Sequence, residues 1–148
     1  MGAHPYYYAV PYEADVNGAL QDLRKREFEA GRYNPVVPFL GFEFDDTLAP
    51  APGKQHASIE AALEASDADG TRSILDVERI GTEPDFGVAL PLPPERLKDL
   101  YGTHQPTREM VLENMDFLAN LDRGQAIYFL LFRDGKPSEI FFAGMSYD

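Results

Sequence analysis

The short segment Asp67-Ala68-Asp69-Gly70-Thr71 has the residue types and the spacing of a chemical site. Two carboxylates separated by one residue, followed by glycine and threonine, could attack a phosphoryl group with the help of Mg²⁺. The same carboxylates could serve as oxygen ligands of Ca²⁺. Aspartate and glycine are also the residues that favour a tight turn. The residues around the segment distinguish these three interpretations.

The surrounding sequence favours the turn. The pattern Asp-x-Asp-Gly-Thr resembles the signature of haloacid-dehalogenase-like phosphatases, in which the aspartates need a position at the end of a buried parallel strand. Here "SIEAALEAS" precedes it and has the composition of a helix, and Arg72 stands where a bulky apolar residue is usual. In a calcium-binding EF-hand loop aligned on Gly70, Ala65 would occupy the position of the first carboxylate. We therefore expect a helix end, a turn and a strand at 72–80.

Other sequence signatures of catalysis and metal binding are incomplete. Asp85-Phe86-Gly87 matches the magnesium-binding triplet of protein kinases, but the chain has only 148 residues and no glycine-rich loop precedes the triplet. The chain has no cysteine, and its 3 histidines stand far apart in the sequence, which argues against a metal cluster. We therefore predict no catalytic residues, no metal site and no cofactor.

Two groups of residues are candidate binding sites, and the first lies before an expected helix at 107–121. His104 and Arg108 flank the start of this helix, where unpaired backbone N–H groups favour anions. In the alternative interpretation, Thr107 caps the helix and Arg108 pairs with acids on a strongly acidic surface. A small anionic ligand is thus one hypothesis for this segment.

The second group is Arg32, Tyr33 and Asn34, at the end of "RKREFEAGRYN", which is the only basic concentration in the chain. Ion pairs between residues four apart on a solvated helix explain most of that segment. Arginine and tyrosine on a loop after a helix are, however, typical contact residues. An anion-recognising pocket would combine these residues with His104 and Arg108.

The pattern of apolar residues predicts an α+β fold in a single domain that spans residues 1–148. We expect a mixed or antiparallel sheet, a C-terminal β-hairpin around Asp134-Gly135, and two main helices packed on the sheet. Helices are expected at 13–30, 58–65, within 93–102 and at 107–121, and strands at 6–12, 39–44, 72–80 and 86–92, followed by the hairpin.

The charge balance limits the classes of partner. The chain has 25 acidic and 13 basic residues, and a formal net charge of −12 repels nucleic acids and anionic membrane surfaces. The longest apolar run, at 126–132, is too short to span a bilayer, and no signal-peptide pattern begins the sequence. The absence of cysteine fits a reducing compartment. We expect a cytoplasmic protein that binds neither nucleic acid nor membrane.

The stretches "VPYEADVNGALQDLRKREFEAGRYNP" and "GKPSEIFFAGMSYD" resemble a family of bacterial hypothetical proteins without a known activity. The resemblance therefore implies no catalytic residues. Size, charge and the missing catalytic motifs favour a non-enzymatic interaction or regulatory module whose partner is another protein, for instance an immunity- or antitoxin-like inhibitor. The alternative is a small enzyme or ligand-binding domain with an anion-recognising pocket near the start of the 107–121 helix.

Overall fold

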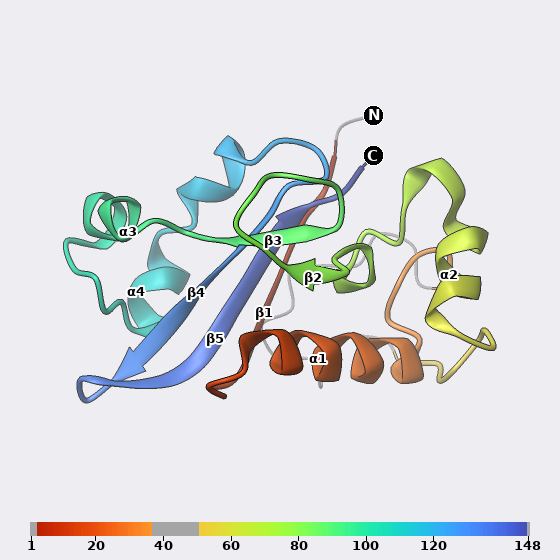
Figure 1. Ribbon diagram of the computed structural model, residues 1–148, viewed down its shortest axis with the longest axis horizontal. Helices are drawn as coiled ribbons and strands as arrows, with labels where there is room; N and C mark the ends of the chain where they lie inside the picture. The colour runs from red at the N-terminus through yellow and green to blue at the C-terminus, as the bar shows by residue number, and fades with distance from the viewer. Residues whose placement is uncertain (1–2, 37–50, 148) are drawn as a thin grey trace.

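A five-stranded mixed sheet forms the centre of the computed structural model, which describes residues 3–36 and 51–147 (Figure 1). The strands lie in the order β1-β5-β4-β3-β2, with β5 antiparallel to both its neighbours and β3 parallel to both of its own. The strands are β1 (Pro5–Pro11), β2 (Arg79–Ile80), β3 (Val88–Pro91), β4 (Ala126–Arg133) and β5 (Lys136–Met145). The expected α+β class with a mixed sheet is confirmed.

The hairpin β4–β5 is formed by the turn that the sequence indicates. Asp134 and Gly135 have φ angles of 53° and 76°, and positive φ at both central residues gives the turn whose twist matches antiparallel strands. Arg133 pairs with Lys136 directly across this turn. The C-terminal hairpin is therefore confirmed at its expected position.

Each main helix has a recognisable boundary residue. Asp15 caps α1 by accepting a hydrogen bond from the backbone N–H of Gly18 at 3.0 Å, and Gly31 ends the helix with a φ of 78°. Thr107 caps α4 in the same way, as the sequence predicts. The helices are α1 (Val16–Ala30), α2 (Ile59–Ser66), α3 (Pro94–Tyr101) and α4 (Arg108–Glu113), with short 3₁₀ helices η2 (Asp67–Asp69), η3 (Ile74–Asp76) and η4 (Asp116–Asn120).

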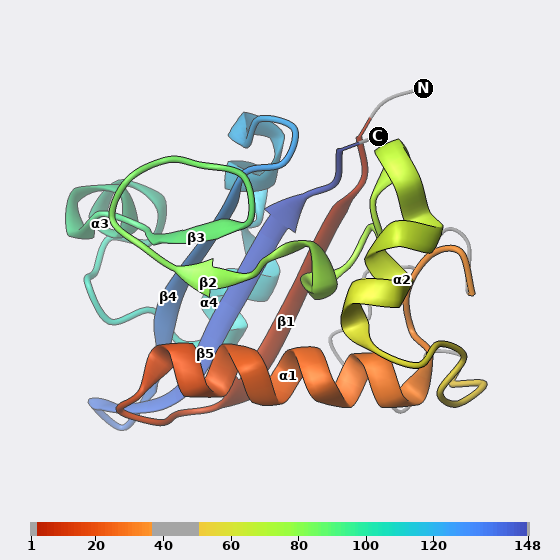
Figure 2. The ribbon, with the colours of Figure 1, turned by 45° about the vertical axis from the view of Figure 1, so that its right-hand side comes forward.

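The helices cover both faces of the sheet, so the core has two layers. Leu20 of α1 packs on one face, whereas Val111 of α4 and Phe117 of η4 pack on the other. Figure 2 shows α1 in front of the strands and α4 behind them. The adjacent residues Phe141 and Phe142 of β5 belong to opposite layers, because successive side chains of a strand point to opposite faces.

The expected single helix at 107–121 is wrong in its extent. Helix α4 ends at Glu113, and η4 begins only at Asp116. Asn114 separates them because its side-chain oxygen accepts a hydrogen bond from the N–H of Asp116 at 3.1 Å, while its side-chain amide donates to the carbonyl of Leu100 at 3.3 Å. Among the described residues, no helix is both long and apolar enough to cross a membrane.

The expected strand at 72–80 is wrong over most of its length. Only Arg79–Ile80 pairs in the sheet, and Ile74–Asp76 forms the 3₁₀ helix η3. The Ser73 side chain starts this helix by accepting a hydrogen bond from the N–H of Leu75 at 3.2 Å. The strand expected at 39–44 lies outside the described residues.

Candidate functional site

The loop 81–87 joins the parallel strands β2 and β3 without a helix between them. Because the second parallel strand starts at the same end as the first, the chain must arch back over the sheet edge. Figures 1 and 2 show this arch, in green, next to β3. All residues from 82 to 86 are exposed. The loop therefore presents its side chains to solvent beside the strand that it enters.

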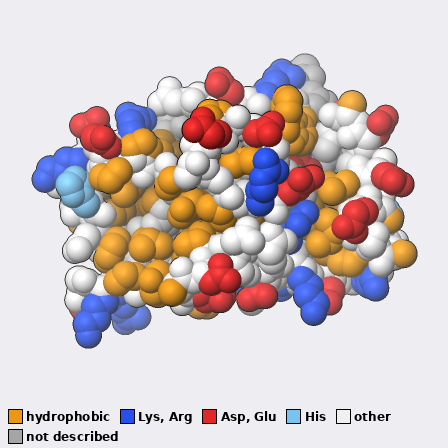
Figure 3. Space-filling view, in the orientation of Figure 1, with side chains coloured by type: hydrophobic (Ala, Val, Ile, Leu, Met, Phe, Trp, Pro, Cys, Tyr) orange, Lys and Arg blue, Asp and Glu red, His pale blue; other side chains and the backbone are white. Residues whose placement is uncertain are grey.

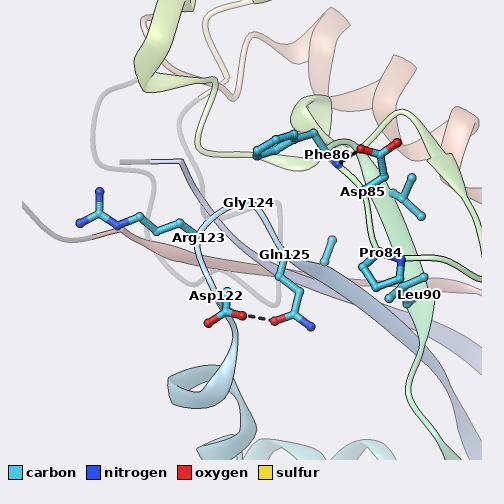
Figure 4. A pocket seen from close by; sticks show the side chains of 10 residues that line it. Pro84, Asp85, Phe86, Leu90, Asp122, Arg123, Gly124 and Gln125 are labelled. Atoms are coloured by element: carbon cyan, nitrogen blue, oxygen red, sulfur yellow. Dashed lines mark hydrogen bonds between the residues drawn. The ribbon is translucent and has the colours of Figure 1, made fainter.

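A cleft of about 480 Å³ lies between this loop and the loop that precedes β4. Figure 4 shows Pro84 and Phe86 on one side of the cleft and Gly124 and Gln125 on the other. Gln125 is held in place, because its side-chain oxygen accepts a hydrogen bond from the N–H of Asp122 at 2.8 Å. Its own N–H donates to the carbonyl of the same residue at 2.9 Å. One wall of the cleft is therefore a rigid turn.

Phe86 is the most exposed of the large apolar side chains in the described chain, at 72%. The Asp85 carboxylate accepts a hydrogen bond from the N–H of Phe86 at 2.8 Å, and Gly87 follows with a φ of 75°. The Phe86 ring packs against the ring of Tyr147, with 5.9 Å between centroids and a tilt of 49°. The ring is thus supported from one side while its other surface remains open to water.

A second cleft, of about 510 Å³, continues along β3 towards α3 and shares Pro84, Leu90 and Gln125 with the first. Its further lining is mainly apolar and includes Leu92 and Leu121. We call the two joined clefts the β3 groove; its principal residues are Pro84, Phe86, Leu90, Leu92, Leu121 and Gln125. Strand β3 has 4 residues, and a strand advances by about 3.3 Å per residue, so the groove follows β3 for roughly 13 Å.

The charged side chains that line the β3 groove are two carboxylates and one arginine at the first cleft, and Arg96 at the second. Asp85 and Asp122 both line the first cleft and are exposed. Asp85 lies 3.5 Å from the guanidinium of Arg79, but both side chains are more than half exposed, so the pair is weak. Arg123 also borders the cleft, and Figure 4 shows its side chain extending away from Pro84 and Phe86.

Hydrophobic side chains also gather elsewhere on the surface. Figure 3 shows an apolar area over β4 and β5, next to α1. The half-buried residues Tyr128 and Leu130 of β4 pack against the core on this face. Leu112 on α4 is 46% exposed. These side chains lie outside the clefts described above, so they provide controls for any role of the groove.

The segment that resembles a phosphatase signature is a turn held by Asp76, as its neighbours in the sequence predict. Asp67 and Asp69 are exposed in η2, and Gly70 follows with a φ of 71°. One oxygen of the buried Asp76 carboxylate accepts hydrogen bonds at 2.8 Å from both the N–H and the hydroxyl of Thr71. Among the described residues, no group of three or more side chains could hold a metal ion.

Asp76 is nonetheless an unusual carboxylate. Its second oxygen is buried and has no hydrogen-bond partner among the described residues. Burial raises the pKa of Asp76 above its usual range, although the hydrogen bonds from Thr71 and the charge of Arg24 oppose this shift. The same carboxylate contributes to the raised pKa values of Tyr6 and Tyr147, behind the effect of their burial.

Arg32, Tyr33 and Asn34 make internal contacts. Arg32 forms a two-pronged ion pair with the buried Glu27, with a shortest distance of 2.7 Å. Tyr33 is fully buried and its hydroxyl hydrogen-bonds to Nδ1 of His56. The N–H of Asn34 donates to the carbonyl of Thr71 at 2.8 Å and its side chain donates to the carbonyl of Gly70, so this segment joins α1 to the turn.

His104 and Arg108 lie on the opposite side of the sheet, next to α4. His104 is exposed, and Arg108 lies 3.9 Å from the carboxylate of Glu139. Arg108 and Arg133 line a hollow of about 430 Å³ that also contains three carboxylates and does not include His104. The structure therefore does not bring the Arg32 and Arg108 groups together in one cleft.

The β3 groove is not predicted from the sequence. Phe86 matches a kinase-like triplet there, and the signal for an exposed contact is an aromatic residue in the polar segment "TEPDFG". The groove itself depends on the pairing of β3 with β4, which no local pattern indicates. Comparisons of the chain with protein-family models, with curated proteins and with solved structures find no match.

Proposed function

We propose that this protein is a non-enzymatic interaction module that binds another protein through the β3 groove. The observation that carries the proposal is the 72% exposure of Phe86 at the mouth of an apolar groove. An aromatic side chain that is rigidly supported and open to solvent loses little conformational freedom on binding. Such residues often contribute a large share of the affinity of a protein interface.

The arrangement of the groove supports a macromolecular partner. Its lining is mostly apolar, and two of its polar side chains already have roles: Gln125 closes a turn, and Asp85 accepts a hydrogen bond from the N–H of Phe86. An apolar groove with charged residues at the rim and an aromatic anchor is typical of peptide and protein recognition. Inhibition of its partner, as in immunity proteins and antitoxins, is the regulatory form of this function.

A single substitution tests the proposal. We expect Phe86→Ser to weaken the complex with a captured partner by about tenfold, because burial of most of a phenylalanine contributes about 1.5–2 kcal/mol. Wild-type protein and the Leu112→Ser control, which removes a partly exposed apolar side chain from α4, should retain the partner. The measurement is affinity capture from source cells, followed by calorimetric titration of the purified partner against all three proteins.

Equal affinity of all three proteins for the partner would contradict the role of the groove. The second candidate function, binding of a small anion, is motivated by Arg108 and Arg133 in one hollow. It would replace the proposal if no partner were captured and if phosphate raised the melting temperature of the wild type but not that of Arg133→Gln. A ligand at about one hundred times its dissociation constant stabilises a fold by about 2.7 kcal/mol, so such a shift is measurable.

A further inference from the structure

We infer that the occupant of the β3 groove is an extended segment of a partner protein in which apolar side chains alternate with lysine or arginine. This inference rests on the proposed function and specifies the chemistry of the partner. It follows from three features of the groove: its length along β3, the prolines at its edge, and the carboxylates at the rim of its first cleft.

The shape of the groove favours an extended chain. Two clefts lie one after the other along β3, and Leu90 lines both of them. The distance of roughly 13 Å along the strand corresponds to four or five residues of an extended peptide at about 3.3 Å each. A helix would rise only about 1.5 Å per residue and would present a face about 10 Å wide, which suits a broader groove.

The edge of the sheet does not offer a backbone template for this segment. Strand β2 covers only the start of β3, at Val88 and Ala89. Beyond them the chain continues with Pro91 and Pro93, which have no N–H to donate. An incoming segment therefore finds no N–H donor at these two positions and cannot form a complete hydrogen-bonded ladder along this edge. It must be held by its side chains, with one apolar group in each cleft.

The rim of the first cleft determines the charge of the part of the occupant that lies there. In an extended segment, the side chains between those that enter the clefts point towards the rim and the solvent. The exposed carboxylates of Asp85 and Asp122 border the first cleft from its two sides. The Asp122 carboxylate has no ion-pair partner among the described residues. Lysine or arginine at the intervening positions over the first cleft complements these carboxylates, whereas the second cleft is lined by Arg96 and by no carboxylate. The net charge of −12 attracts a basic segment over longer distances.

Three fluorescein-labelled seven-residue peptides test this chemistry by fluorescence polarisation. The first alternates lysine with phenylalanine or leucine, the second has glutamate in place of lysine, and the third has serine in place of the apolar residues. We expect the first to bind at least tenfold more tightly than either of the others. Phe86→Ala should weaken the binding of the first peptide by about tenfold.

A matched pair of charge reversals separates local recognition from general attraction. Asp122→Lys changes a carboxylate at the rim, whereas Glu64→Lys makes the same change of charge on the exposed surface of α2. We expect Asp122→Lys to weaken binding of the first peptide by fivefold or more, and Glu64→Lys by less than twofold. Equal effects of the two variants would overturn the inference, because the attraction would then come from the net charge of the molecule.

The other outcomes are also decisive. If the glutamate peptide binds as tightly as the lysine peptide and both depend on Phe86, the basic partner is overturned while the groove remains the docking site. If the lysine peptide does not bind up to about 1 mM, or binds Phe86→Ala unchanged, the inference fails. If sedimentation shows a wild-type dimer that Phe86→Ala dissociates, the occupant is a second copy of this chain, and the basic segment is likewise overturned.

Discussion

At the scale of single residues, Asp76 explains why the segment 67–71, which resembles a phosphatase signature, forms a turn. Its carboxylate binds both polar groups of Thr71 through one oxygen. The other oxygen lies only 2.8 Å from the point that a Cβ on Gly70 would occupy, so it fills the space that a side chain there would need. The aspartates that suggest chemistry in the sequence are the exposed ones. The residue that organises the turn comes several positions later, in η3.

The raised pKa of Asp76 predicts a specific dependence of stability on pH. A carboxyl group with a higher pKa in the folded state binds more protons there than in the unfolded chain, so folding is favoured by protonation. We expect the contribution of Asp76 to the free energy of unfolding to be greatest below the usual aspartate range. It should decrease as pH rises through the raised pKa, by about 1.4 kcal/mol for each tenfold difference in proton affinity between the folded and unfolded states.

The Asp76→Asn variant removes this titration and keeps an oxygen for Thr71. Urea unfolding between pH 3 and pH 8 should therefore show a smaller loss of stability with rising pH in Asp76→Asn than in the wild type. The control is Asp69→Asn, an exposed aspartate in the same turn, which should follow the wild-type profile. A profile of Asp76→Asn parallel to that of the wild type would show that Asp76 ionises normally.

At the scale of elements, Tyr147 joins three loops that are far apart in the sequence. The residue follows β5, and its ring lies 2.7 Å from the position of a Cβ on Gly124 and 2.7 Å from that on Gly70. Its ring also contacts Phe86 of the loop 81–87. The orientation of the exposed phenylalanine therefore depends on a glycine in the facing loop, because only glycine allows Tyr147 to approach so closely.

This packing predicts different effects for two glycine substitutions. Gly135→Ala places a Cβ in open space and should cost about 1 kcal/mol, since its φ of 76° is strained for alanine. Gly124→Ala has nearly the same φ, 75°, but its Cβ would also collide with Tyr147, so we expect a loss of about 1–3 kcal/mol more. Guanidinium unfolding measures both. Equal losses would indicate that the Tyr147 ring moves aside without cost.

The same elements show which features a sequence can predict. The hairpin turn at Asp134-Gly135 and the cap at Thr107 depend on residues within four positions of each other, and both are found where expected. The break at Asn114 depends on Leu100, which lies in another helix, and the helix is accordingly predicted too long.

The binding residues follow the same rule. Arginine is a residue type that is common at contact surfaces, but Arg32 forms an internal ion pair with Glu27. The β3 groove is formed by two loops that meet only because β3 pairs with β4. Local patterns identify turns and caps because the interacting atoms are close in the chain. They do not identify surfaces assembled by the sheet.

At the scale of the whole molecule, the ion pairs of the interior differ from those of the surface. The one closely paired and buried ion pair among those described joins Glu27 and Arg32, whereas the contacts of Arg79 and Arg108 are longer and more exposed. Exposed pairs of this kind contribute about 0–1 kcal/mol each. With 25 acidic and 13 basic residues, one-to-one pairing would leave 12 carboxylates without a basic partner, and mutual repulsion opposes the folded state.

This repulsion predicts that salt stabilises the protein. Between about 0.01 M and 0.15 M the Debye length falls from about 30 Å to about 8 Å, which screens repulsion across the surface but affects the buried Glu27–Arg32 pair much less. We expect the melting temperature at pH 7 to rise by about 3 °C in sodium chloride, equivalent to about 1 kcal/mol at this size. A variant in which four exposed acids are neutralised should start from a higher melting temperature and respond less to salt; its substitutions are Glu29→Gln, Glu64→Gln, Asp99→Asn and Glu113→Gln.

A wild-type melting temperature that falls with salt would mean that attractive surface pairs outweigh the repulsion. In that case the long-range attraction of a basic partner would also lose its basis, because both effects arise from the same uncompensated carboxylates.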